Sequence, residues 1–114
     1  MKLVIIESPY AAITETILKR NIRYLQAAMH DCLVNHHESP YASHGLYTQP
    51  GVLRDEDPEE RRCGMLAGFA WRKVAEMTVV YTDLGISPGM KAGISHAEKH
   101  GVHVVYRTLP GWGK

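Results

Sequence analysis

The 114-residue sequence has only two cysteines and no excess of charge of either sign. Cys32 and Cys63 do not form a C-x-x-C pair or a zinc-binding spacing, so we expect two reduced thiols in a cytoplasmic protein. Thirteen basic and twelve acidic residues leave a formal charge of +1, without the basic excess typical of proteins that bind duplex DNA. No apolar run approaches the roughly 18 residues of a membrane span. We therefore expect neither duplex nucleic acid nor a membrane as a partner.

Several catalytic motifs are also missing. The sequence has no G-x-x-x-x-G-K-[ST], no G-x-G-x-x-G and no G-x-S-x-G, so a P-loop, a dinucleotide fingerprint and a serine-hydrolase elbow are unsupported. Seven histidines are present, but none forms H-E-x-x-H. His96 and His100, four residues apart on an expected helix, lack a third ligand. We expect no metal and no cofactor.

Apolar runs and helical patterns alternate along the chain, which has the composition of one globular domain over residues 1–114. Residues 2–7 form a β-branched run typical of a strand buried on both faces. After Thr14, an expected N-cap, apolar residues from Leu18 to Cys32 recur at steps of four and three, which predicts a helix to about residue 36. The other expected elements are a short strand at 41–44, a helix from Asp57 to about Glu76, a strand at 77–82, a helix from Ser87 to Gly101 and a strand at 102–106.

This order of elements predicts an α/β, flavodoxin- or Rossmann-like fold of three layers. Its parallel sheet has four strands, or five with a further edge strand, in the order 2-1-3-4. The strand order reverses between strands 1 and 3, and ligands bind outside the carboxyl ends of strands at such a point. The loops over residues 7–10 and 83–90 leave the sheet there. We expect the functional site between them.

The second of these loops has the features of an anion-binding helix start. Ser87 can cap the helix, Gly89 lets a ligand approach the backbone, and the first-turn N–H groups up to Met90 point outwards. The simpler alternative is that Ser87 and Pro88 only begin a helix.

Three further side chains are candidates for chemistry at the same place. Asp83, at the end of the expected third strand, can hold sugar hydroxyls, a base edge or a metal, or simply close a turn near Gly85. Tyr10, after Pro9, can stack on a base or be an ordinary surface tyrosine. His44, at the end of the expected second strand, is a candidate general base.

Four segments occur together in a characteristic order. They are the strand end Ser8-Pro9-Tyr10, the stretch from Pro40 to Tyr47 that carries His44, the helix start Asp57-Pro58-Glu59-Glu60-Arg61, and the loop Asp83-x-Gly85-Ile86-Ser87-x-Gly89-Met90. Together they resemble the nucleoside 2-deoxyribosyltransferase-like superfamily, over roughly residues 2–107. The resemblance is greatest to small stand-alone members of unknown function from phage and prophage genomes.

This resemblance implies a flavodoxin-like domain that binds nucleosides or nucleotides and works as a homo-oligomer. Enzymes of the superfamily cleave or exchange N-glycosidic bonds, attacking the sugar C1′ with a glutamate. By resemblance, Ser87 corresponds to the phosphate-binding serine and Asp83 to the sugar-orienting aspartate, while Tyr10 and His44 line the base and sugar side. The predicted nucleotide-binding residues are Ser8, Pro9, Tyr10, Asp83, Ser87, Gly89 and Met90, and the predicted catalytic residues are Asp83 and His44.

The resemblance breaks at Gly93, where the nucleophilic glutamate would fall. Without it the covalent intermediate of retaining chemistry has no evident nucleophile, so we expect no exchange of one base for another. The first hypothesis is a nucleotide- or nucleoside-binding protein, with or without N-glycosidase-type hydrolysis oriented by Asp83. The alternatives are a non-catalytic phage protein that sequesters a nucleotide-derived signal in the host cytoplasm against host defence, a small-molecule phosphohydrolase using His44 or Asp83, and a pure interaction module.

Overall fold

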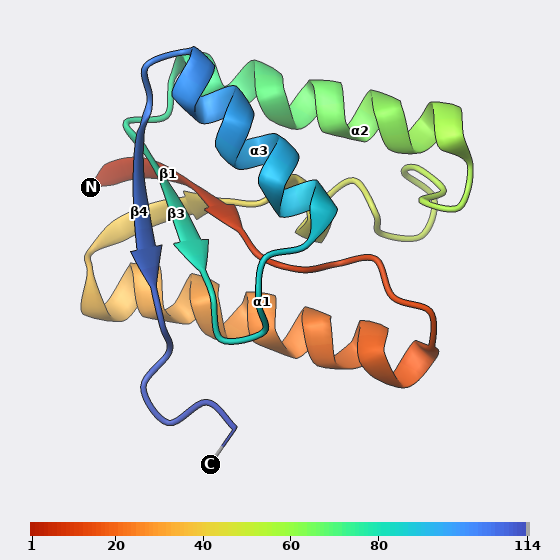
Figure 1. Cartoon of the computed structure of the whole chain (residues 1–114), viewed down its shortest axis with the longest axis horizontal. Coiled ribbons are helices and arrows are strands. Elements are labelled where there is room, and N and C mark those ends of the chain that lie inside the picture. Colours follow the sequence, from red (N-terminus) through yellow and green to blue (C-terminus); the bar gives the residue numbers. More distant parts are fainter. Residues whose placement is uncertain (114) are drawn as a thin grey trace.

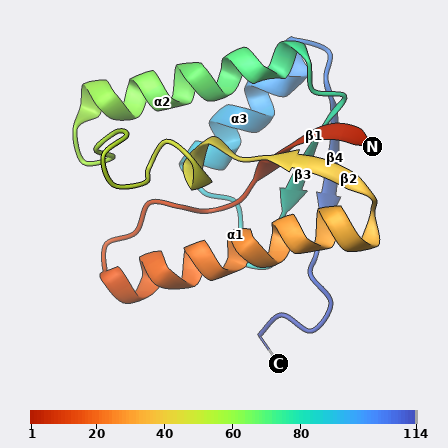
Figure 2. The same cartoon turned by 180° about the vertical axis from the view of Figure 1, so that it is seen from behind.

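Four parallel strands pair in the order β2-β1-β3-β4, as the sequence predicts. The structure is a computed structural model and describes residues 1–113. The helix α1 lies on one side of the sheet, and α2 and α3 lie on the other (Figures 1 and 2). The elements are β1 (Lys2–Glu7), α1 (Glu15–Asn35), β2 (Glu38–Tyr41), the 3-10 helix η1 (Ser43–Gly45), α2 (Pro58–Ala70), the 3-10 helix η2 (Trp71–Lys73), β3 (Met77–Tyr81), α3 (Pro88–Lys99) and β4 (His103–Arg107). This is the expected three-layer α/β fold.

The central strands are apolar because helices cover both faces of the sheet. Side chains alternate along a strand, so Val4, Ile6 and Val79 pack in the larger core beneath α1. Val80 points the other way and packs with Met90 of α3. None of the helices within residues 1–113 combines the length and the apolar character needed to cross a bilayer.

The helix α1 begins at the predicted cap. The hydroxyl of Thr14 accepts a hydrogen bond from a first-turn N–H group. The fully buried positions include Tyr24 and Ala28, whereas Leu18 and Ile22 of the predicted apolar stripe are only partly buried. Leu25 and Cys32 of the stripe are buried, so the face that meets the sheet combines part of the predicted stripe with Tyr24 and Ala28.

The second strand lies earlier than predicted, at residues 38–41 instead of 41–44. Its residues pair with β1 from Lys2 to Ile5. Pro40 makes this segment look unsuited to a sheet, but β2 is an edge strand, where a missing N–H group is tolerated. Residues 43–45 form η1 instead. The strand prediction at 41–44 was therefore wrong, and His44 lies on a 3-10 turn beyond the strand.

The two helices on the other side begin as predicted. The carboxylate of Asp57 accepts hydrogen bonds from the N–H groups of Glu59 and Glu60, at 2.9 and 3.3 Å. The α-helix that follows ends at Ala70 and continues as η2 to Lys73, short of the expected end. It packs on η1 more than on the sheet, which leaves space between the helix and the strand ends.

Candidate functional site

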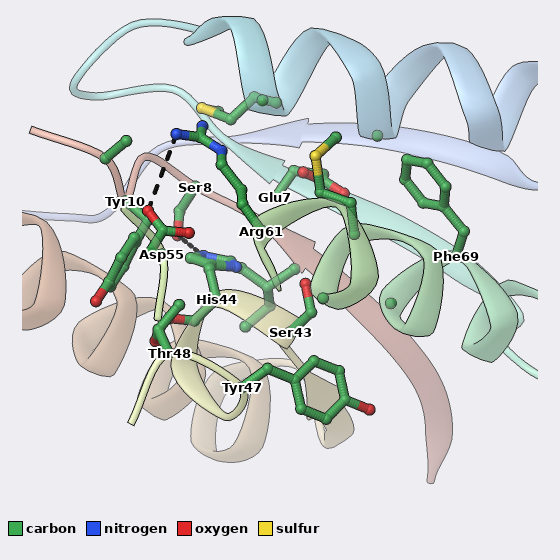
Figure 3. A pocket seen from close by; sticks show the side chains of 18 of the residues that line it. Glu7, Ser8, Tyr10, Ser43, His44, Tyr47, Thr48, Asp55, Arg61 and Phe69 are labelled. Carbon is green, nitrogen blue, oxygen red and sulfur yellow. Dashed lines mark hydrogen bonds and ion pairs between the residues drawn. The ribbon is translucent and has the colours of Figure 1, made fainter. Parts of the chain in front are cut away.

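A cavity of about 260 Å³ lies at the carboxyl ends of β1 and β2. Its walls are the end of β1, the chain after β2, one side of α2 and the N-terminal half of α3 (Figure 3). This volume is close to the roughly 300 Å³ at which small-molecule pockets begin. The cavity therefore lies beside the predicted reversal of strand order and is large enough for a small ligand.

The structure brings most of the predicted binding residues, and the predicted catalytic residue His44, to this cavity. Those that line it are Ser8, Tyr10, His44, Ser87, Gly89 and Met90. Pro9 lies between two of them in the chain but is not part of the lining. These residues come from three separate segments, as the topology implies.

Asp83 is the exception, because it does not line the cavity. Its Oδ2 accepts hydrogen bonds from the hydroxyl of Tyr24 at 2.6 Å and from the N–H group of Leu109 at 2.9 Å. β3 ends at Tyr81, two residues before Asp83, and the carboxylate turns towards α1 and the C-terminal segment. The structure thus ties Asp83 to the opposite side of the sheet from the cavity, contrary to the expectation that it faces the site.

Ser8 and His44 form a polar pair inside the cavity. The Ser8 Oγ and His44 Nε2 atoms are 2.7 Å apart (Figure 3), and Ser8 is 5% exposed. Burial lowers the pKa of His44 to about 4, so the ring is neutral at pH 7. The ring of Tyr10 meets the imidazole edge-on, with centroids 6.5 Å apart. A neutral imidazole and a hydroxyl can together hold a ligand hydroxyl or pass a proton.

The start of α3 carries the predicted cap. Ser87 Oγ accepts a hydrogen bond from the N–H group of Met90 at 3.3 Å. Among the described residues, the N–H group of Gly89 makes no hydrogen bond. A Cβ atom at Gly89 would meet only Ser87 Oγ, at 4.0 Å, so the approach to this backbone is open. The helix therefore presents an unused donor at the positive end of its dipole.

Glu7 is a site residue that sequence analysis missed. It is the last residue of β1 and lines the cavity, with its side chain 14% exposed. Burial raises the pKa of Glu7 to about 7, although the nearby Arg72 guanidinium acts to lower it. The available signal was a carboxylate at the end of a buried strand, directly before a loop expected to form the site.

Arg72 holds this carboxylate from the side of η2. Its Nη2 atom lies 3.4 Å from Glu7 Oε2 and donates to the carbonyl oxygen of Gly93 at 3.1 Å. The same guanidinium donates to Thr78 of β3, and Arg72 is 3% exposed. Its charge is thus fixed in place beside the cavity.

Gly93 has a specific steric reason to be glycine. A Cβ atom there would lie 2.1 Å from Glu7 Oε2 and 2.6 Å from Oε1. The structure shows that the space above it is taken by the carboxylate of Glu7.

The mouth of the cavity carries charges of both signs. Asp55 and Arg61 form an ion pair with 3.9 Å between Oδ2 and Nη1 (Figure 3). Because this pair is partly exposed, it holds the two side chains only weakly. Within residues 1–113 no three metal-ligating side chains gather at one place.

A family model described as "Domain of unknown function (DUF7768)" matches residues 2–107. The chain belongs to this family. A comparison with curated proteins found no match. The fold is similar to that of a solved 2-deoxyribosyltransferase from the psychrotolerant bacterium Bacillus psychrosaccharolyticus, with a TM-score of 0.63 and 15% sequence identity over 96% of this chain and 74% of that chain. At this identity the likeness concerns the fold, and it confirms the predicted resemblance at that level.

Proposed function

We propose that the cavity binds a nucleotide or nucleoside, with the phosphate of a nucleotide at the start of α3. The observation that carries this proposal is the convergence of the unpaired Gly89 N–H group at the start of α3 and a polar, aromatic wall on one cavity. Amide groups at a helix N-terminus favour phosphate. On the facing wall, the Tyr10 ring offers a surface for a base, and the pair formed by Ser8 and His44 offers partners for sugar hydroxyls.

The comparison with solved structures supports the same class of ligand. The similar structure is that of a 2-deoxyribosyltransferase that is a suitable biocatalyst for the industrial synthesis of nucleosides. We propose that the chain hydrolyses the N-glycosidic bond of its ligand. This reaction would release a free base and a sugar phosphate.

A binding experiment with Ser87→Asp tests the phosphate site. Aspartate is a good N-cap, so the helix is retained, but its charge repels phosphate. We expect nucleoside 5′-monophosphates to raise the melting temperature of the wild-type protein. Calorimetric affinity for them should fall at least tenfold in the variant, about 1.4 kcal/mol.

Thr14→Asp is the matched control, since it makes the same change at the N-cap of α1, away from the cavity. We expect this variant to bind like the wild type. Unchanged monophosphate affinity in Ser87→Asp would remove the phosphate site from this loop.

The products separate hydrolysis from the other hypotheses. Free base released from a nucleotide indicates N-glycosidic hydrolysis, and inorganic phosphate indicates a phosphohydrolase. Tight binding without either product indicates a protein that sequesters its ligand.

We also propose that the chain forms a homo-oligomer. The side containing α2 and η2 exposes Leu66, Trp71 and Val74, which are 55%, 48% and 55% exposed. Exposed apolar side chains on one segment suit an interface, and identical copies are the commonest partners. Light scattering at micromolar concentration should give a multiple of the mass of one chain. Leu66→Glu should shift it towards a single chain, and a single-chain mass for the wild type would contradict the proposal.

A further inference from the structure

We propose that Glu7 is the catalytic base of the cavity, which activates a water molecule for attack on the sugar carbon of the bound nucleotide. This inference rests on the proposed function and adds to it the residue that performs the chemistry. Sequence analysis assigned catalysis to Asp83 and His44, and Asp83 lies outside the cavity.

The first argument is where the carboxylate of Glu7 is placed. The alternation along β1 puts Val4 and Ile6 in the core beneath α1, so Glu7 points to the side of α2 and α3. Its Oε2 faces Arg72. Its Oε1 has no hydrogen-bond partner among residues 1–113. The fully buried side-chain atoms that lack a partner in that range do not include Oε1, so part of its surface is accessible. One carboxylate oxygen is therefore held while the other keeps access to the cavity.

The second argument is that the helix above makes space for this carboxylate. Gly93 lies inside α3, where glycine weakens a helix relative to alanine. Even a methyl group there would collide with both oxygens of Glu7. Glycine at position 93 thus weakens α3 locally but leaves the space that the Glu7 carboxylate occupies beside the cavity.

The third argument is electrostatic. Glu7 faces Arg72 of η2 and the backbone of Gly93 in α3. His96 of α3 contacts Arg72 and not Glu7. His44 lines the same cavity as Glu7. Burial outweighs Arg72 and raises the pKa of Glu7 to about 7. A base whose pKa lies near the working pH is ionised often enough to act and basic enough to take a proton. Carboxyl groups shifted in this way cluster at functional sites.

The proposed step is a single displacement by water. The water oxygen forms a bond to C1′ with one of its electron pairs, and its proton passes to Glu7. The bond between C1′ and the base nitrogen breaks, and its electron pair leaves with the base. The base then takes up a proton from solvent, and Glu7 releases its own. The products are a free base and a sugar phosphate, with no covalent enzyme intermediate.

The test measures binding and base release separately for Glu7→Gln. The wild-type protein and the variant are incubated with the four 2′-deoxyribonucleoside and four ribonucleoside 5′-monophosphates, and free base is quantified by chromatography. We expect calorimetric affinity to change less than threefold in Glu7→Gln, because glutamine keeps the size of the side chain. We expect base release to slow by about a hundredfold or more, the usual contribution of a general base.

Three further measurements sharpen the assignment. The wild-type rate should rise with pH around a pKa near 7, and this dependence should be absent in Glu7→Gln. Glu7→Asp should retain part of the rate because a carboxylate remains. Glu98→Gln, on the exposed part of α3 outside the cavity, is the matched control and should leave the rate unchanged. Melting temperatures establish that each variant is folded.

The outcomes distinguish this inference from the proposed function. If none of the monophosphates binds, the proposed function fails, and the inference with it. Binding without base release, or an undiminished rate in folded Glu7→Gln, overturns the role of Glu7 and leaves the binding proposal standing. A swapped nucleotide formed by the wild type in the presence of a second free base would reveal a covalent intermediate. That result would overturn the role of Glu7 as a base.

Discussion

Two glutamate–arginine pairs lie on opposite faces of the sheet, and they are built differently. On the side of α1, Arg107 donates to both carboxylate oxygens of Glu38, at 2.8 and 2.7 Å. These hydrogen bonds lower the pKa of Glu38. On the side of α2 and α3, Glu7 and Arg72 share one contact of 3.4 Å, and burial raises the pKa of Glu7 to about 7. The first pair is a satisfied structural contact, whereas the second leaves a carboxylate with unused bonding capacity beside a cavity.

The surroundings of the two pairs follow the same contrast. Near Glu38, Tyr81 donates to Asp31 at 2.8 Å and Arg107 also reaches the Tyr81 hydroxyl at 3.4 Å. On the cavity side, burial shifts the pKa of His44 downwards and that of Glu7 upwards, because it disfavours the charged form of each side chain. On one face of the sheet the ionised groups are therefore paired, and on the other the cavity keeps titratable groups with shifted pKa values.

Removing each arginine should have the largest effect and should separate the two pairs. Arg107→Met leaves the buried Glu38 without its partner, and we expect a loss of about 3–5 kcal/mol in the free energy of unfolding at pH 7. Arg72→Met should cost less, since Glu7 is already half protonated at that pH. Urea denaturation of both variants measures the difference. An equal loss of unfolding free energy in the two variants would contradict the proposed difference between the two glutamate–arginine pairs.

The pH dependence of stability should differ in sign between the two glutamates. The pKa of Glu7 rises from 4.5 to about 7 on folding, so the folded state binds more protons and stability falls as pH rises through this range. At 1.36 kcal/mol per pKa unit this is about 3 kcal/mol. The lowered pKa of Glu38 has the opposite effect: its contribution is present above the unfolded pKa and is lost as pH falls through the folded pKa.

The free energy of unfolding of the wild type is compared with that of Glu7→Gln and of Glu38→Gln from pH 2 to 8. Each difference removes the contribution of the histidines, which all three proteins share. The free energy of unfolding of the wild type should fall relative to that of Glu7→Gln as the pH rises towards 7. The free energy of unfolding of the wild type should rise relative to that of Glu38→Gln as the pH rises. Parallel curves would show that Glu7 is not perturbed by burial.

The smallest expected effect comes from Gly93→Ala. Alanine usually stabilises a helix interior relative to glycine, but here the methyl group meets the Glu7 carboxylate. We expect a loss of about 1–3 kcal/mol, the usual cost of overpacking. In a Glu7→Ala background the same substitution should be stabilising, and thermal unfolding of the four proteins forms a double-mutant cycle. Additive effects would contradict the contact between the two residues.

Local sequence features were enough to predict much of the fold. Thr14, Asp57 and Ser87 cap the helices that they were expected to cap, because a cap depends only on residues within one turn. The alternation of strands and helices predicted the sheet order. The position of β2 was missed because Pro40 argues against a strand unless the strand is known to lie at an edge.

The candidate site was predicted only in part, and Asp83 and Glu7 show why. Both are carboxylates at or just after the end of a strand, and nothing in their neighbouring residues distinguishes them. Asp83 is turned away by Tyr24 and Leu109, whereas Glu7 is held at the cavity by Arg72 and the space above Gly93. These partners are distant in the chain, so their contacts exist only once the sheet and its two helical layers have assembled.

The sequence by itself therefore determined the kinds of elements, their order, the helix caps and the end of the sheet where the cavity lies, because periodicity and capping are local properties. Only the tertiary structure decided which carboxylate faces the cavity, which glutamate has both oxygens paired and why residue 93 is glycine. Those properties depend on burial and on the face of the sheet to which a side chain points. Both are set by packing between residues far apart in the chain.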